Sequence, residues 1–186
     1  MKIFTIALLA SLLASSALVH AEDRVDRAEI GPFSLVGDEP HALVLGVGGF
    51  DLFHEGARGT QGTRPVGVAE IRFGRKLLFL GPLLGLGSTG QGNIFGYGGV
   101  GLDAEAGAWS FLPAASLVGY RQGGGKELYG TVLFEAELTV VRKLASETRG
   151  GLTFAHISNG YRHGSDVRLN PGAEMLLLTV LFSLGH

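Results

Sequence analysis

The clearest pattern in the chain is an alternation of apolar and polar residues over 127–141. One parity carries apolar side chains: Leu128, Val132, Phe134, Ala136, Leu138 and Val140. The other parity is mostly polar: Tyr129, Thr131, Glu135, Glu137 and Thr139. Successive side chains of a β-strand point to opposite faces. The segment is therefore predicted to be a strand with one apolar face and one polar face.

Period-two character recurs along most of the chain. It marks eight segments of about ten residues each, a spacing typical of small outer-membrane barrels. They are 41–52, 64–74, 77–87, 93–103, 107–120, 127–141, 149–159 and 173–184. The chain is 46% hydrophobic, yet no segment after the N-terminal region reaches the ~18 consecutive apolar residues of a membrane helix. Because a closed barrel pairs every backbone group with a neighbouring strand, we expect an all-β fold, an eight-stranded antiparallel transmembrane β-barrel over 41–186.

The N-terminal region has the features of an export signal. Lys2 precedes a nearly uncharged apolar run over 3–17, and Val19-His20-Ala21 follows it with residues that a signal peptidase accepts. Residues 1–21 are therefore predicted to be a cleaved signal peptide. Residues 22–40 are mixed and charged, and we expect them to form an irregular periplasmic lead-in.

Composition narrows the function classes further. The formal net charge is −2, so no polybasic surface indicates nucleic acid binding. The chain has no cysteine, which excludes disulfides and thiolate chemistry. No cluster of His, Cys and Asp has metal-ligand spacing, and neither a metal nor a cofactor is expected.

The connections between the segments alternate in kind. Three are short: Gly74–Lys76, Glu105–Gly107 and Lys143–Thr148. The others are more polar or richer in glycine: Phe53–Thr63, Ser88–Gly92, Arg121–Lys126 and Gly160–Gly172. Bacterial barrels place short turns in the periplasm and longer loops outside the cell, so the 160–172 connection is predicted to be external. A soluble eight-stranded carrier, with its apolar face turned inward, remains the structural alternative.

His156 and Ser158 are the first candidates for chemistry. They are two residues apart at the end of the seventh segment, so they share a face with Leu152 and Phe154. An imidazole at that spacing can accept the serine proton, which nucleophilic acyl transfer requires. In the membrane interpretation this face meets lipid, where polar side chains are functional candidates.

Glu174, at the start of the eighth segment, is another polar residue on a face predicted to meet lipid. It shares its parity with apolar residues only: Leu176, Leu178, Val180, Phe182 and Leu184. A charge on the lipid face costs least near the interface, which predicts a position at the external rim. On a strand adjacent to that of His156, the carboxylate can accept a hydrogen bond from the second imidazole nitrogen, as the acid of a Ser-His-acid triad does.

Three other groups of residues have simpler explanations. His163-Gly164-Ser165-Asp166 offers a second His, Ser and acid, but we expect a solvated loop there. The glycines of 96–101 match a dinucleotide fingerprint without a strand-to-helix unit, so a crowded barrel strand explains them better. Four charged residues are predicted to form an interior ion-pair network: Glu70, Arg72, Glu135 and Glu137.

The paired motifs Phe154–Asn159 and Asn170–Glu174 resemble those of the outer-membrane lipid A 3-O-deacylase family, the PagL-like enzymes. The match covers about the last thirty residues. The resemblance implies an eight-stranded barrel with Ser158 as nucleophile, His156 as general base and Glu174 as its orienting acid. It also implies that Asn159, with the Gly160 backbone, contributes to the oxyanion hole.

These inferences lead to one expected function and its rivals. The expected enzyme is a carboxylic ester hydrolase of the Gram-negative outer membrane, acting on lipid A of lipopolysaccharide in the outer leaflet. The main alternative is a structural or adhesive small barrel without activity, in which apolar replacements of His156 or Glu174 are neutral or stabilising. A soluble lipid carrier is the third interpretation. The sequence leaves open whether the protein forms a homodimer.

Overall fold

The computed structural model describes residues 27–53, 62–128, 130–159 and 172–184. These residues form eleven strands and a single sheet, and none of them belongs to a helix that could cross a membrane. The strands are β1 (Arg27–Ile30), β2 (Phe33–Val36), β3 (Ala42–Phe50), β4 (Arg64–Arg72), β5 (Gly81–Thr89), β6 (Ile94–Gly101), β7 (Ala104–Ala106), β8 (Trp109–Arg121), β9 (Val132–Lys143), β10 (Thr148–Ser158) and β11 (Ala173–Ser183).

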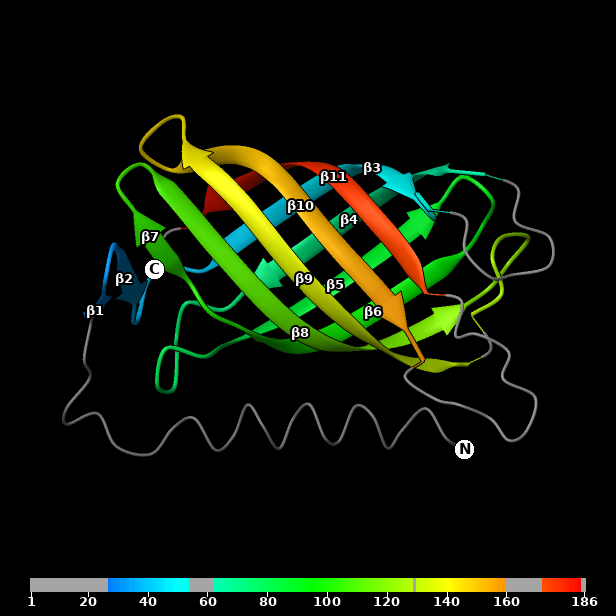
Figure 1. Cartoon of the computed structure of the whole chain (residues 1–186), viewed down its shortest axis with the longest axis horizontal. Helices are drawn as coiled ribbons and strands as arrows, with labels where there is room; N and C mark the ends of the chain where they lie inside the picture. The colour runs from blue at the N-terminus through cyan, green and yellow to red at the C-terminus, as the bar shows by residue number, and fades with distance from the viewer. Residues whose placement is uncertain (1–26, 54–61, 129, 160–171, 185–186) are drawn as a thin grey trace.

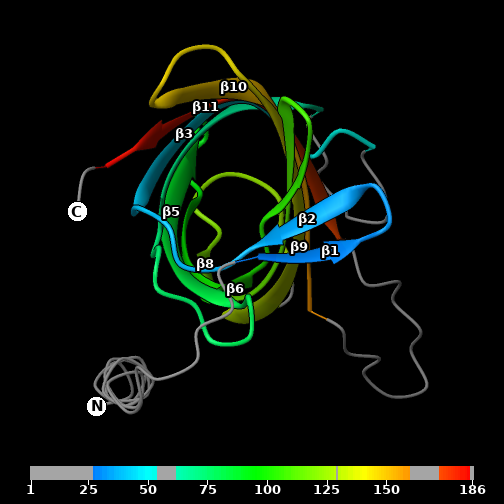
Figure 2. The same cartoon turned by 90° about the vertical axis from the view of Figure 1, so that its left-hand side faces the viewer.

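Eight of the strands close into an antiparallel barrel. The order β8-β6-β5-β4-β3-β11-β10-β9 is completed by pairing of β8 with β9, so no barrel strand has a free edge. Figure 1 shows the tilted strands from the side and Figure 2 shows the ring along the barrel. The predicted eight-stranded barrel is confirmed. Its third strand starts later than predicted, because residues 77–80 form a turn, and its sixth starts at Val132 rather than at 127.

The two ends of the barrel differ. At one end, here called the short-turn rim, strands are joined by the segments 73–80, 102–108 and 144–147. The opposite end, the long-loop rim, is where β3 and β10 end and β11 begins. His156, Ser158 and Glu174 all lie near the long-loop rim, as the sequence predicted.

The outer wall of the barrel is apolar. In β9, Phe134 and Leu138 are 55% and 44% exposed, whereas Glu135 and Thr139 are buried. The same alternation runs along β5, β10 and β11. An apolar exterior around a charged lumen is the arrangement of a membrane barrel and the reverse of a soluble carrier. Leu128 departs from the predicted parity: it precedes β9 and is buried, 1% exposed.

The lumen is packed by two kinds of contact. Arg72 forms the predicted ion pairs, with Nε 2.7 Å from Glu70 Oε1 and Nη2 2.7 Å from Glu137 Oε1. Apolar side chains fill the half toward the long-loop rim, among them Phe50, Phe95, Leu133, Ile157 and Met175. Glu135 also lies inside, but its Oε2 is buried without a hydrogen-bond partner among the described residues. The network predicted for four residues therefore joins three of them directly.

The dinucleotide-like glycines lie within a strand, as expected. Residues 96–101 belong to β6, which pairs with β5 and β8 on its two sides. A Cβ on Gly99 would stand 2.1 Å from the Ala115 carbonyl oxygen, so only glycine fits where these backbones approach.

The lead-in is not wholly irregular, which corrects the expectation for residues 22–40. β1 and β2 form a hairpin, and β2 pairs with β7 beside the short-turn rim. The segment after β2 is held by Lys76, whose Nζ lies 2.6 Å from Glu39 Oε1 and also binds Asp103. Residues 1–21, the predicted signal peptide, lie outside the described residues.

The charge cluster of Lys76, Glu39 and Asp103 makes the stability of the folded protein depend on pH. Burial, the hydrogen bond to Asp103 and the negative charge of Asp103 together raise the pKa of Glu39 to about 7. Burial opposes ionisation of Asp103, but the Glu39 hydrogen bond and the charges of Lys76 and Arg72 outweigh it and lower the pKa of Asp103. Glu39 therefore binds its proton more tightly in the folded protein than in the unfolded chain.

We predict that Glu39→Gln removes part of the pH dependence of stability. A carboxyl with a raised folded-state pKa stabilises fully below its unfolded pKa, and this contribution disappears as pH rises through about 7. The free energy of unfolding of the native chain, relative to Glu39→Gln, should thus fall by ~1–3 kcal/mol between pH 5 and pH 8. Urea titrations at each pH measure it, and parallel curves for the two proteins would contradict it. Asp103 does not interfere, since its lowered pKa acts only in the acid range.

Candidate active site

Strand β10 presents His156 and Ser158 on the outer wall. The His156 side chain is 42% exposed, and its neighbours Ala155 and Ile157 point inward with 1% and 0% exposure. Leu152 and Phe154, on the same face as His156, are exposed. The predicted parity is therefore confirmed for the seventh barrel strand.

Glu174 lies directly opposite His156 on the neighbouring strand. The β10–β11 register pairs the two residues, and His156 Nδ1 is 3.0 Å from Glu174 Oε1. Because an ionised carboxylate only accepts hydrogen bonds, this contact places the ring proton on Nδ1 and leaves Nε2 as the acceptor. The predicted contact between imidazole and carboxylate is present.

The carboxylate is largely shielded although it shares the parity of the outer wall. The Glu174 side chain is 11% exposed, and its Oε2 is buried with no hydrogen-bond partner among the described residues. A buried carboxylate in contact with a half-exposed imidazole can fix the orientation of the ring, which is the geometry of a catalytic acid-histidine pair.

Ser158 occupies the next outward position of β10. It pairs with Phe134 of β9, whereas His156 pairs with Ala136 on that side. The hydroxyl and the ring thus share one face near the rim, but proton exchange between them stays a prediction. The two oxyanion candidates are also untested: Asn159 Nδ2 lies 3.2 Å from the Leu128 carbonyl oxygen, and Gly160 lies outside the described residues.

Gly172 is a functional candidate that sequence reasoning missed. It immediately precedes β11, and a Cβ there would stand 2.2 Å from His156 Cε1 and 2.9 Å from Nε2. The backbone of residue 172 therefore covers the imidazole closely. The Asn-Pro-Gly stretch before Glu174 was the available signal, but the contact depends on the strand register.

We predict that Gly172→Ala displaces the His156 ring and, if the site hydrolyses esters as expected from the sequence, lowers catalytic efficiency. A shift of about 1 Å in a catalytic group can cost ~10²-fold, so kcat/KM should fall by about that factor. The free energy of unfolding should change little, because the side-chain ring moves more readily than the backbone. Ester hydrolysis and urea unfolding measure the two effects. Gly67→Ala, on the outer wall of β4 with nothing within 4 Å of the new Cβ, is the matched control, and equal activity of both variants would contradict the prediction.

The connection between β8 and β9 is linked to both strands that carry the site. Its Leu128 carbonyl receives the Asn159 hydrogen bond at the end of β10. Its Lys126 forms a buried ion pair with Asp51, whose backbone N–H donates to the Glu174 carbonyl oxygen at 2.8 Å. Asp51 has a φ of 63°, an uncommon left-handed value that Asp adopts more readily than most residues with a side chain. These contacts join distant segments, so no local pattern could have indicated them.

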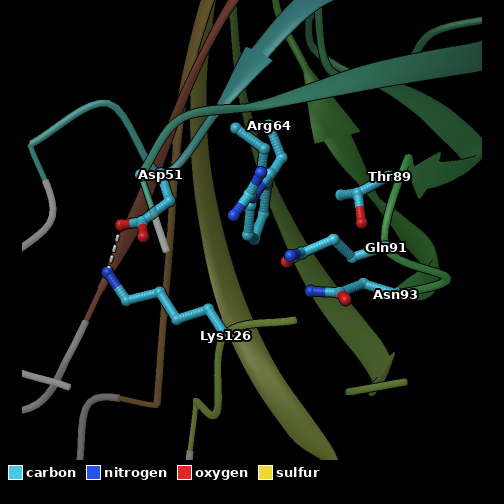
Figure 3. A pocket seen from close by; sticks show the side chains of 8 residues that line it. Asp51, Arg64, Thr89, Gln91, Asn93 and Lys126 are labelled. Carbon is cyan, nitrogen blue, oxygen red and sulfur yellow. Dashed lines mark hydrogen bonds and ion pairs between the residues drawn. The ribbon is translucent and has the colours of Figure 1, made fainter. Parts of the chain in front are cut away.

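A small cavity lies inside the barrel at the long-loop rim, beside this ion pair. Figure 3 shows Asp51, Arg64, Thr89, Gln91, Asn93 and Lys126 around it. Its volume of about 10 Å³ has room for about one water molecule. Thr89 Oγ1 and Asn93 Oδ1 are buried there without hydrogen-bond partners among the described residues. The cavity is too small for a lipid or sugar group.

Other candidate chemistry finds no support in the described part of the chain. There, no three His, Cys, Asp or Glu side chains gather as ligands of a metal ion. The second group of His, Ser and acid, over 163–166, lies outside the described residues.

Comparison with known proteins concerns the fold of the barrel. No protein-family model matches the chain, and no curated protein matches it in sequence. A solved structure from the de novo design of transmembrane β-barrels matches with a TM-score of 0.53 at 10% identity, covering 80% of this chain and 100% of the designed one. This protein has the fold of a transmembrane β-barrel. The crystal structure of Neisserial surface protein A (NspA) matches with a TM-score of 0.46 at 9% identity, covering 88% of this chain and all of that one.

Proposed function

We propose that this transmembrane barrel is a serine esterase that removes the ester-linked 3-O-acyl chain from lipid A in the outer membrane of a Gram-negative bacterium. One observation carries the proposal. On a wall whose exposed side chains are mostly apolar, His156 Nδ1 lies 3.0 Å from Glu174 Oε1 across adjacent strands. Polar groups on a lipid-facing wall cost free energy, so a paired imidazole and carboxylate there favour catalysis over packing.

The mechanism assigns one role to each side chain. Glu174 holds the Nδ1 proton, and His156 Nε2 accepts the proton of Ser158 as its hydroxyl attacks the ester carbonyl. Asn159 and the Gly160 backbone N–H stabilise the tetrahedral oxyanion, each donor contributing ~3 kcal/mol. His156 then protonates the departing sugar hydroxyl. Water, deprotonated by His156, releases the fatty acid from the acyl-enzyme.

The surroundings of the site suit a lipid substrate. Leu152, Phe154, Leu176 and Leu178 are between 42% and 68% exposed on the same two strands. Acyl chains can lie along them while the sugar stands at the rim. If the long loops face outward, as in bacterial barrels, this rim meets the outer leaflet, which contains lipid A.

A structural or adhesive barrel without activity is the second candidate. The match to the designed transmembrane barrel is in the fold alone, which this candidate explains without an active site. A barrel without activity, however, leaves the His156–Glu174 pair on the outer wall without a role. Mass spectrometry of lipid A from cells with and without this chain separates the two functions. Loss of one 3-hydroxy acyl chain only when the chain is present supports the esterase, and identical lipid A supports the structural barrel.

A further inference from the structure

The connection between β4 and β5 ends in an unusual hairpin turn. Leu77 and Leu80 exchange backbone hydrogen bonds of 2.9 and 3.0 Å, and between them Leu78 and Phe79 have φ values of 50° and 70°. Two central residues with positive φ define a type I′ turn, for which Asn-Gly is the favoured sequence. Leu and Phe are strained in this conformation, so backbone preference does not explain their presence.

The side chains of this hairpin are apolar and open. Leu77, Leu78 and Leu80 are 77%, 83% and 44% exposed. Leu80 continues the outward parity of β5, where Leu84 and Leu86 are 51% and 64% exposed. The hairpin therefore extends the lipid-facing surface of the barrel past the short-turn rim.

Lys76 fixes the direction of the hairpin. Its Nζ binds Glu39 and Asp103 at the lead-in, and its backbone N–H donates to Asp38 Oδ1 at 2.8 Å. Because successive side chains of an extended chain point to opposite sides, Leu77 points away from this cluster. Figures 1 and 2 both show the β4–β5 connection outside the barrel wall.

We propose that the 77–80 hairpin is a lipid anchor, whose tip inserts among the acyl chains at the edge of the leaflet on the short-turn side. Burial of the leucine side chains in hydrocarbon offsets the strain of the turn. In water, the same tip would be an exposed apolar patch of the kind that promotes association. Because the hairpin continues the apolar outer wall of the barrel, we take lipid, rather than a protein partner, to surround its tip.

Depth-dependent fluorescence quenching tests the anchor. Trp109, the chain's single tryptophan, is replaced by Phe, and Leu78→Trp is introduced. The protein is folded into phosphatidylcholine vesicles with bromine on the acyl chains near the headgroup or near the bilayer centre. We expect a blue-shifted emission that loses most of its intensity to the shallow bromines. Ser146→Trp, in the exposed β9–β10 turn of the same rim, is the matched control. Its emission should show no blue shift and should lose no intensity to the bromines.

Any of three results would overturn the anchor. One is a Leu78→Trp emission that matches the control in colour and in resistance to bromine, in barrels shown to be folded by their migration in unheated detergent gels. The second is the same outcome for Leu77→Trp, which replaces the Leu78 variant if that variant does not fold. Emission that is blue-shifted but unquenched assigns the tip to a protein contact and equally rejects lipid.

Discussion

Ser158→Ala abolishes the release of 3-hydroxy fatty acid from lipid A while the barrel remains folded; this is the result we expect if the proposed function is correct. Without the hydroxyl no acyl-enzyme forms, and removal of a serine nucleophile costs on the order of 10⁴–10⁶-fold in kcat. Ser158 pairs with Phe134 at the end of β10 and lies outside the packed lumen, so its loss should not affect folding. Mass spectrometry of lipopolysaccharide incubated with purified protein measures the release.

A second serine supplies the control for this experiment. Ser88 lies on the outer wall of β5 near the same rim, paired with Ile94, and Ser88→Ala should release fatty acid at the native rate. Release by Ser158→Ala at that rate would end the esterase mechanism and leave the structural or adhesive barrel. The lipid anchor at the opposite rim would be unaffected, because it depends on the fold alone.

The largest expected effect on stability comes from Arg72→Met. Arg72 is 8% exposed and its guanidinium faces Glu70, Glu137 and Asp103 inside the barrel. Removing one partner of a buried ion pair leaves the others uncompensated, at a cost of ~3–5 kcal/mol. Urea unfolding in detergent should show a loss of this size.

The exposed Arg121, at the end of β8, is the matched control for Arg72. Arg121→Met should change the free energy of unfolding by less than ~0.5 kcal/mol. A double variant, Arg72→Met with Glu137→Met, should recover part of the loss because one uncompensated carboxylate is gone. Equal stability of the two single variants would show that the lumen does not depend on these ion pairs.

The alternation of side chains predicted most of the barrel. It located all eight barrel strands and the outward faces of β9, β10 and β11, since burial of one face of a strand imposes a period of two on the sequence. The same parity placed His156, Ser158 and Glu174 on one wall. The β1–β2 hairpin and β7 were missed because strands of three or four residues are too short to show a period.

The supports of the candidate site could not be predicted in this way. The buried Lys126–Asp51 ion pair joins residues 75 positions apart, and Leu128 packs into the lumen before its strand begins. Gly172 covers the imidazole only because β10 and β11 pair in one particular register. Such contacts are set by closure of the whole sheet, which leaves no local periodicity.

By itself, the sequence determined an all-β chain of eight barrel strands, each with one apolar and one polar face, and it named the three residues of the candidate triad. These features follow from local chemistry, since each strand must match one face to lipid and the other to the lumen. The tertiary structure decided which residues meet: His156 opposite Glu174, Arg72 among three carboxylates, and Lys76 holding the lead-in. Partners across strands depend on register and on barrel closure, which are properties of all eight strands together.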